Sequence, residues 1–406
     1  MKKLLQIGLG IIAAVGGYVD IGDLVFNAQA GATFGYKTLW AIPVGVLGIG
    51  IFAEMSGRVA AITKKGNFDL VKEHFSKSVG TLALVASLFV SVGTLAAEIG
   101  GAGVALNLMW NVSDQFFAVV AFVMIAAAAA LLSFDWIERV FGYMGLALLV
   151  FVAAALKLHP HWSAVTKGIV PHASGTAQYW YFIVGLVAAA LMPYEIYFYS
   201  SGAIEEGWTK KDLGLNRINV VLGYGLGALL AVGILMTAAQ TLQAPGISPA
   251  TLGTTALAVQ IPYGGLGLML ALVGMLFAIG GAAIDTAFSA AYNLSQYMGW
   301  PWGKHRGLRN VPRFTMTLAG AFLIGFIIVQ TGVDPVQLTE YSVIFSALAM
   351  PLTFLPVILT ANNRSEMGEQ VNGPFARVMG WLYFVIICIL AVAAPILLFA
   401  TNGGSS

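Results

Sequence analysis

Asp20 and Asp23 place two carboxylates about one helical turn apart, within an apolar stretch long enough to cross a membrane. An ionised aspartate at the centre of a bilayer costs about 3 kcal/mol on insertion scales, so such a pair requires compensation. A bound cation, or backbone that opens into a polar cavity, would supply it. Gly16, Gly17 and Gly22 flank the pair and favour a broken helix with exposed main-chain carbonyls. The pair therefore predicts a cation site in a transporter.

The composition predicts that these residues lie inside a membrane. The 406 residues are 59% hydrophobic and 9% charged, with a mean hydropathy of +0.85. Such values exclude a soluble domain of this length and indicate a polytopic membrane protein. The single cysteine, Cys388, excludes a disulfide within the chain and a cysteine-based metal site. Because no enzyme or nucleic-acid signature occurs in a supporting context, we expect neither an enzyme, nor a cofactor, nor a nucleic-acid partner.

Eleven apolar runs are long enough to form membrane-spanning helices. They fall near residues 8–33, 38–62, 80–109, 115–134, 136–157, 177–204, 216–242, 264–297, 314–331, 336–361 and 378–400. If the N-terminus is cytoplasmic, 17 of the 20 lysine and arginine residues lie on the cytoplasmic side, as the positive-inside rule requires. We therefore expect one multi-pass domain in the cell inner (plasma) membrane, with an extracytoplasmic C-terminus.

The sixth predicted span also contains a break and a carboxylate. Pro193 removes a backbone donor and disrupts the helix ahead of it, and Glu195 follows two residues later. Spans one and six lie five spans apart, so they enter the membrane from opposite sides. Two inverted repeats of five helices, 8–157 and 177–361, followed by an eleventh helix at 378–400, would explain this arrangement. In such transporters the substrate binds between the two breaks.

The residues at the breaks indicate which ions could bind. The carboxylates of Asp20 and Asp23 suit Mg²⁺, Ca²⁺ or Mn²⁺. The soft thioether of Met192 would favour Mn²⁺, Fe²⁺ or later transition metals over Mg²⁺ and Ca²⁺. Methionine is also a common apolar filler, so its role as a ligand stays open. Carbonyls freed at the breaks, such as those of Ala189 or Asp20, could complete the coordination.

Further acidic residues lie within predicted spans. Glu195 lies beyond the break, where it would support the ligands or carry a proton. Glu98 has apolar surroundings that favour its protonated form, which suits a proton relay, although a neutral glutamate bonded to a neighbouring helix is the alternative. Asp285 would contact span one or assist the ion path. Glu54 precedes Arg58 by one turn, which predicts an i,i+4 ion pair near the cytoplasmic face.

Several different short motifs are distributed along the whole chain. They are Asp20 with Gln29-Ala30-Gly31, Gly35-Tyr36 and Leu39-Trp40, then Glu98-Ile99-Gly100, Met192-Pro193 with Tyr197 and Ser200, Phe277-Ala278-Ile279-Gly280, and Met367-Gly368-Glu369. In this order they resemble the signature of the NRAMP family of divalent-metal transporters, which typically reads Asp-Pro-Gly-Asn in its first helix and Met-Pro-His-Asn in its sixth.

The resemblance implies a LeuT-type fold, alternating access and a metal site built from spans one and six. By position, Asp20 and Met192 match the family's metal-binding aspartate and methionine. Asp23 stands in place of its asparagine, and Ala189 in place of its carbonyl donor. Glu98 matches the glutamate associated with proton movement.

The chain also departs from this pattern, which marks it as a divergent member. The departures are Ile21 for proline, Asp23 for asparagine, Tyr194 for histidine, Glu195 for asparagine, Leu95 for an aspartate found in many members, Val343 for glutamine, and Asp285-Thr286 for Gly-Gln. The missing histidine and aspartate leave the family's usual proton route incomplete, whereas Met192 retains the group that selects transition metals.

The sequence therefore predicts a monomeric secondary transporter that imports a divalent metal ion, Mn²⁺ or Fe²⁺ being favoured, with a proton as the candidate co-substrate. Two alternatives stay open. Mg²⁺ would suit the additional carboxylate of Asp23. A small organic solute would suit the changes at Tyr194, Val343 and Asp285, and the carboxylates would then bind a coupling Na⁺ or H⁺.

Overall fold

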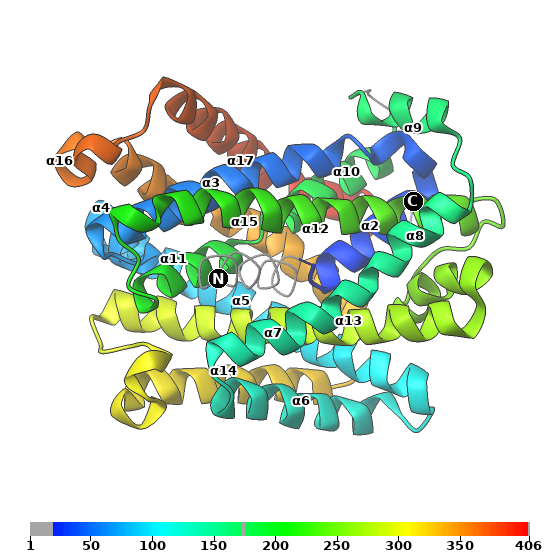
Figure 1. Cartoon of the computed structure of the whole chain (residues 1–406), viewed down its shortest axis with the longest axis horizontal. Coiled ribbons are helices and arrows are strands. Elements are labelled where there is room, and N and C mark those ends of the chain that lie inside the picture. Colours follow the sequence, from blue (N-terminus) through cyan, green and yellow to red (C-terminus); the bar gives the residue numbers. More distant parts are fainter. Residues whose placement is uncertain (1–18, 172–174, 405–406) are drawn as a thin grey trace.

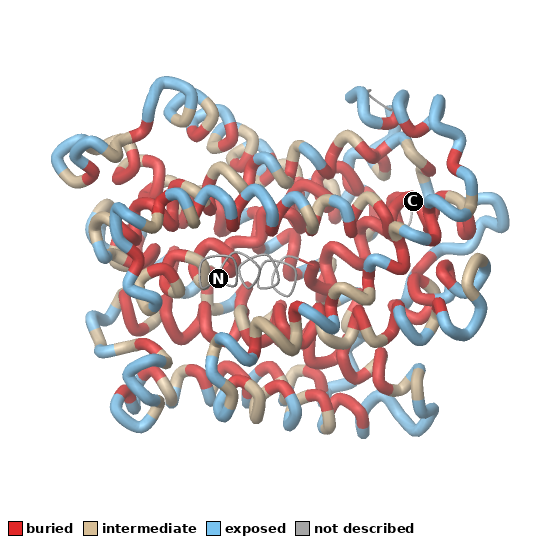
Figure 2. Tube along the Cα trace, viewed as in Figure 1, coloured by how far each residue is buried: buried red, intermediate tan, exposed pale blue. Residues whose placement is uncertain are grey.

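The computed structural model describes residues 19–171 and 175–404, and every regular element in them is a helix. Ten helical segments of this part are long and apolar enough to cross a membrane. Figure 1 shows the long helices running side by side, with the connecting loops gathered at the two ends of the bundle. Buried residues lie along the middle of the bundle and exposed ones at its ends and periphery (Figure 2). The architecture is that of a polytopic all-α membrane protein.

The ten segments correspond to predicted spans two to eleven. They are α3 (Ala41–Thr63), α5 (Lys77–Trp110), α6 (Asp114–Leu131), α7 (Phe134–Gly145) with α8 (Leu149–Lys157), α10 (Ala177–Ala189) with α11 (Pro193–Glu205), α12 (Leu213–Thr241), α13 (Leu252–Met298), α14 (Pro312–Gln330), α15 (Pro335–Ala361) and α17 (Pro374–Ala400). Short helices α4 (Asn67–His74), α9 (Trp162–Ile169) and α16 (Arg364–Met367) lie in the connections.

The first predicted span, 8–33, is described only in its second half. That half forms α2 (Ile21–Phe34). The earlier residues, with Lys2 and Lys3 on which the predicted orientation partly depends, lie outside the described residues. Residues 21–32 of α2 are all buried, so this helix lies inside the bundle.

The segment before span eight differs from the prediction, which left residues 243–263 as a connection. α13 begins already at Leu252, capped by the Thr251 side chain, which accepts a hydrogen bond from the backbone N–H of Thr254. The helix is interrupted at Gly264, where φ is +61°, two residues after Pro262. The predicted span therefore starts at the break, and the short helix before it is additional.

α2 is held in place by close contacts of its backbone with α12. A Cβ atom on Gly31 would lie 2.2 Å from the carbonyl oxygen of Leu235. On the other side, a Cβ on Gly185 of α10 would lie 2.1 Å from the ring of Phe26. Gln29 adds a hydrogen bond from its amide nitrogen to the Glu340 carboxylate of α15, 3.0 Å long. Small residues thus allow three helices to close around α2.

Replacing Gly31 by alanine should destabilise the protein, because the new methyl group meets backbone that cannot rotate away. We expect the free energy of unfolding to fall by about 2 kcal/mol, seen as a lower apparent melting temperature in detergent. Gly320→Ala is the matched control, since a Cβ at Gly320 of α14 has no atom within 4 Å. Equal melting temperatures of the two variants would contradict the close approach of α2 and α12.

The connection between α13 and α14 is hydrogen-bonded to Glu205, the last residue of α11. The Glu205 carboxylate accepts a hydrogen bond of 2.9 Å from the backbone N–H of Lys304. The Lys304 ammonium donates to the carbonyl of Ala129 at 2.7 Å and lies 5.1 Å from the ring centroids of Phe134 and Phe288. Burial lowers the pKa of Lys304 to about 8, although the nearby Glu205 carboxylate opposes the shift.

This lowered pKa predicts a pH dependence of stability. The unfolded chain holds the Lys304 proton up to a pH of about 10.4, whereas the folded protein releases it near 8. Stability should therefore rise with pH between these values relative to a Lys304→Met variant, which has no proton to release. Melting temperatures of both proteins between pH 7 and pH 10 measure the effect, and parallel curves would contradict the burial of the ammonium group.

Candidate functional site

The first break lies at Asp20, immediately before α2. The backbone of Asp20 is extended, with φ −91° and ψ −176°, and α2 begins at Ile21. Asp20 Oδ1 accepts a hydrogen bond of 2.9 Å from the backbone N–H of Asp23, and the Asp20 carbonyl accepts one from Leu24. Asp20 is therefore the N-cap of α2, and the positive end of the helix dipole faces its carboxylate. The predicted interruption near the aspartate pair is confirmed.

The second break separates α10 from α11. α10 ends at Ala189, and Met192 is the N-cap of α11, with Pro193 as its first residue. Proline has no N–H to give the carbonyl of Ala189, its partner four residues back in a continuous helix. The chain between them therefore leaves the helical path at a fully buried position, where Met192 is 1% exposed. The predicted break in span six is confirmed as well.

A hydrogen bond between Tyr194 and Asp20 joins the two breaks. The Tyr194 hydroxyl donates to Asp20 Oδ2 at 3.1 Å. The backbone carbonyl of Tyr194 in turn accepts a hydrogen bond of 2.8 Å from the Ser289 hydroxyl of α13. Three elements far apart in the sequence thus meet at Tyr194. Met192 precedes Tyr194 by two residues, so its backbone lies at the same junction.

Asp23 is buried with less compensation than Asp20. The two side chains are 2% and 1% exposed, respectively. Asp23 Oδ2 has no hydrogen-bond partner within residues 19–171 and 175–404. A Cβ on Gly22, between the two aspartates, would lie 3.0 Å from Asp20 Oδ1 and 3.2 Å from Val343 of α15. The site is therefore bounded by an apolar side chain where the family pattern has an amide, and burial of this carboxylate oxygen without a partner among the described residues is energetically costly.

Glu98 and Asp285 lie beside this junction, on α5 and α13. Glu98 is fully buried, and its Oε1 accepts a hydrogen bond of 3.4 Å from the Thr286 hydroxyl. Its Oε2 has no partner in the described part of the chain. Asp20 and Asp285 are the charged groups within electrostatic reach of Glu98. The glutamate is thus bonded to a neighbouring helix and also retains an open oxygen.

Glu195 lies on the side of the junction that faces α12. It is 7% exposed and bonded to the Tyr224 hydroxyl. Asp23, Asp20 and Asp285 are the carboxylates within its electrostatic reach. The structure therefore gathers the predicted acidic residues of four helices around the two breaks.

The sequence analysis did not identify Ser289 and Tyr224 as site residues, although both have a sequence feature that could have indicated them. Each is a hydrogen-bonding side chain in a strongly apolar helix, and Ser289 follows Asp285 by four residues, which places both on one helix face. The ion pair predicted between Glu54 and Arg58 is confirmed, with a distance of 3.0 Å.

The donor set fits a metal ion only if groups other than carboxylates take part. In residues 19–171 and 175–404, no three histidine, cysteine, aspartate or glutamate side chains gather closely enough to hold an ion by themselves. Asp20 and Asp23 would supply two carboxylates. The Met192 thioether and the Ala189 carbonyl at the facing break would be the additional ligands.

Comparison with known proteins identifies the family. The sequence model described as natural resistance-associated macrophage protein-like (Nramp) matches residues 10–396. The chain belongs to the Nramp family. A relative named divalent metal cation transporter MntH, from Mycobacterium leprae, is 26% identical over 407 residues, which cover 95% of this chain and 90% of the relative. The resemblance found in the motifs is confirmed, and the low identity agrees with a divergent Nramp member.

Solved structures confirm the predicted LeuT-type fold. A mutant of the Eremococcus coleocola manganese transporter superposes with a TM-score of 0.75 at 19% identity, covering 95% of this chain and 85% of that one. The protein MhsT, solved in complex with L-phenylalanine, superposes with a TM-score of 0.63 at 14% identity, covering 95% of this chain and 98% of that one. The Nramp chain is thus a multi-pass membrane protein of this fold.

Asp23 should reduce the stability of the metal-free protein. Asp23→Asn removes a buried carboxylate that repels Asp20 and restores the residue type of the Nramp pattern. We expect the metal-free variant, in excess EDTA, to gain about 2 kcal/mol in stability and to melt at a higher temperature. Asp135→Asn, at an exposed carboxylate of α7, is the control and should change stability by less than about 0.5 kcal/mol. A lower melting temperature of Asp23→Asn would contradict an uncompensated carboxylate.

Proposed function

We propose that this protein is a secondary-active transporter that imports a divalent metal ion by alternating access, with Mn²⁺ or Fe²⁺ favoured. The observation that carries the proposal is the hydrogen bond between Tyr194 and Asp20, which brings two broken helices together at a buried carboxylate pair. Membership of the Nramp family and the name of the MntH relative support a divalent metal as the transported substrate.

In this proposal Asp20 and Asp23 bind the ion through their carboxylate oxygens. Met192 and the carbonyl of Ala189 complete its coordination, and the thioether disfavours Mg²⁺ and Ca²⁺. Both oxygens of Asp20 accept hydrogen bonds in the described structure. An arriving ion must therefore displace the Tyr194 hydroxyl or share Oδ2 with it. This exchange couples ion binding to the contact that holds α2 against α11.

We also propose that Glu98 carries a proton if transport is coupled to one. Its open Oε2 and its position next to Thr286 and Asp285 support this role. Glu195 and Asp285 would guide the cation on either side of the breaks, since both lie within electrostatic reach of the site. The lost histidine of the family pattern is replaced by Tyr194, whose hydroxyl donates to Asp20 rather than titrating near neutral pH.

The membrane arrangement follows the charge distribution. We propose a monomer in the plasma membrane with a cytoplasmic N-terminus, an extracytoplasmic C-terminus and a single domain of two inverted repeats, 8–157 and 177–361, plus α17. The basic loops support this orientation.

Mg²⁺ transport is the second candidate. Asp23 adds a carboxylate where the family pattern has an asparagine, and an additional carboxylate suits a harder ion. A small organic solute carried with Na⁺ or H⁺ is the third, and it would use the same two breaks.

Reconstituted proteoliposomes that enclose a metal-responsive dye test the proposal. We expect uptake of Mn²⁺ by the wild-type protein and loss of this uptake to background in Asp20→Ala. The control variant Asp135→Ala removes an exposed carboxylate of α7 and should transport like wild type. Met192→Ala should weaken discrimination against Mg²⁺ and Ca²⁺ more than it weakens Mn²⁺ uptake.

The outcomes separate the candidates. Uptake of Mg²⁺ with no uptake of Mn²⁺ would support the second candidate instead. Absence of flux for every divalent ion, together with no calorimetric binding of Mn²⁺, would contradict divalent metal transport. Recording the internal pH in the same vesicles shows whether protons enter with the metal, and an unchanged pH during Mn²⁺ uptake would contradict the role proposed for Glu98.

A further inference from the structure

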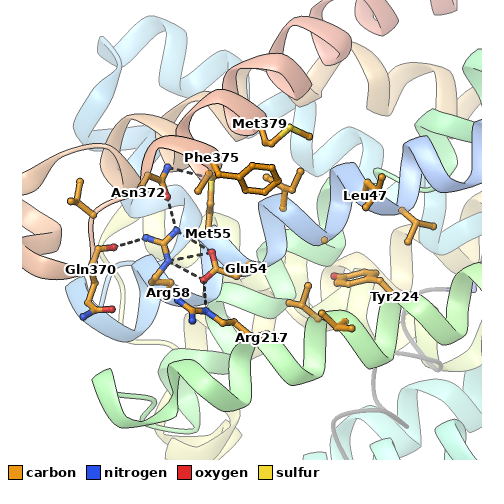
Figure 3. Close-up of a pocket in the computed structure, with 18 of the residues that line it drawn as sticks. Leu47, Glu54, Met55, Arg58, Arg217, Tyr224, Gln370, Asn372, Phe375 and Met379 are labelled. Carbon is orange, nitrogen blue, oxygen red and sulfur yellow. Dashed lines mark hydrogen bonds and ion pairs between the residues drawn. The ribbon is translucent and has the colours of Figure 1, made fainter.

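A groove of about 690 Å³ lies on the side of the bundle, and Tyr224, which is bonded to Glu195, is among the residues that line it. Its walls are α3, α12 and α17, and the segment 369–373 before α17 closes one end (Figure 3). All three helices are membrane-crossing segments. Where these helices cross a membrane, the open side of the groove would face lipid.

One end of the groove is polar and contains two arginines with different surroundings. Arg58 is 4% exposed and donates to Glu54, to the carbonyl of Gln370 and, at 2.6 Å, to Asn372. The side chain of Arg217 is 66% exposed, and its ion pair with Glu54 has a nitrogen–oxygen distance of 3.7 Å. Figure 3 shows the two guanidinium groups on either side of the Glu54 carboxylate. Arg58 is thus fully engaged, whereas Arg217 has donors left for a ligand.

The rest of the groove is apolar and open to the outside of the bundle. Leu47 of α3, Val221 of α12 and Phe375 of α17 are 58%, 69% and 77% exposed. Met379 lies one turn beyond Phe375 on the same helix and also lines the groove. Such a surface accommodates a hydrocarbon chain without exposing a polar group to it.

The order of these features along the helices matches the way a phospholipid lies in a leaflet. The polar end lies near the start of α12 and α17 and the end of α3, where the basic loops of the bundle gather. The apolar part lies farther along the same helices, away from these loops. Arg58 and Arg217 both pair with Glu54, and the second lining glutamate, Glu369, is paired with Lys210, so one positive charge is left at the polar end, which favours an anion.

We propose that this groove binds one phospholipid with an anionic headgroup. Its phosphate contacts the exposed guanidinium of Arg217, and an acyl chain lies along Leu47, Val221 and Met379. The guanidinium supplies planar donors for phosphate oxygens, and the surrounding low-dielectric medium strengthens the contact. The groove is also lined by Tyr224, which is bonded to Glu195, but the lipid contacts proposed here use none of the proposed metal ligands, so the proposal stands whether or not the transport proposal does.

Lipid binding to the purified full-length protein tests this proposal. Phosphatidylglycerol and phosphatidylcholine with the same acyl chains are titrated in detergent, and bound lipid is counted by native mass spectrometry. We expect phosphatidylglycerol to bind more tightly, with one high-affinity copy per protein. Arg217→Gln should weaken that binding about tenfold, which corresponds to one charge-assisted contact. Lys211→Gln removes an equal charge at the same end but outside the groove, and should bind like wild type.

A second variant separates chain binding from headgroup binding. Gly225 lines the groove, and a Cβ there would have no atom within 4 Å, so Gly225→Leu fills the groove without a clash. It should reduce the binding of both lipids while the lipid-free melting temperature stays near that of wild type. Glycerol phosphate, which lacks acyl chains, should bind much more weakly than phosphatidylglycerol. Equal affinity for the two lipids in wild type, or equal losses in Arg217→Gln and Lys211→Gln, would overturn the proposal.

Discussion

Two buried carboxylates at the start of α2 impose the constraint on which the rest of this structure depends. Asp20 and Asp23 are almost fully buried, and a charge in such a place is costly unless it is bonded or paired. Two hydrogen bonds offset part of this cost for Asp20. Its carboxylate caps α2 and accepts a hydrogen bond from the Tyr194 hydroxyl. Asp23 Oδ2 is left without a partner in the described residues. We therefore propose that a bound cation completes the site and stabilises it.

The packing around α2 serves to hold that pair in position. Gly31 lets α2 contact the backbone of α12, and Gln29 fastens it to Glu340 of α15. The facing break is stabilised separately, since Ser289 of α13 bonds the Tyr194 carbonyl. The bond between Tyr194 and Asp20 is then the direct polar link between two parts that are each well supported. A link of this kind can open when an ion replaces it, whereas the surrounding helices keep their contacts.

The sequence predicted those features that depend on local chemistry. Ten spans and both breaks followed from apolar runs, Pro193 and the aspartate pair, and the motifs identified the family. The helix before Gly264 was missed because residues 252–263 are too few to cross a membrane by themselves, and Pro262 and Gly264 separate them from the longer apolar run that follows. The partners Tyr224 and Ser289 could not be assigned, since a hydrogen bond between distant helices depends on their rotation and register. The roles of the predicted site residues remain proposals for the same reason.

The central claim is that a divalent metal binds where the two breaks meet. Anomalous diffraction from crystals grown with Mn²⁺, recorded near the manganese absorption edge, tests it most directly. The account predicts one strong peak within about 2.3 Å of carboxylate oxygens of Asp20 and Asp23, on the side of Met192 and the Ala189 carbonyl. It also predicts that the Tyr194 hydroxyl moves from Asp20 Oδ2 or shares that oxygen with the ion. A strong peak elsewhere, with none at this junction, would contradict the account.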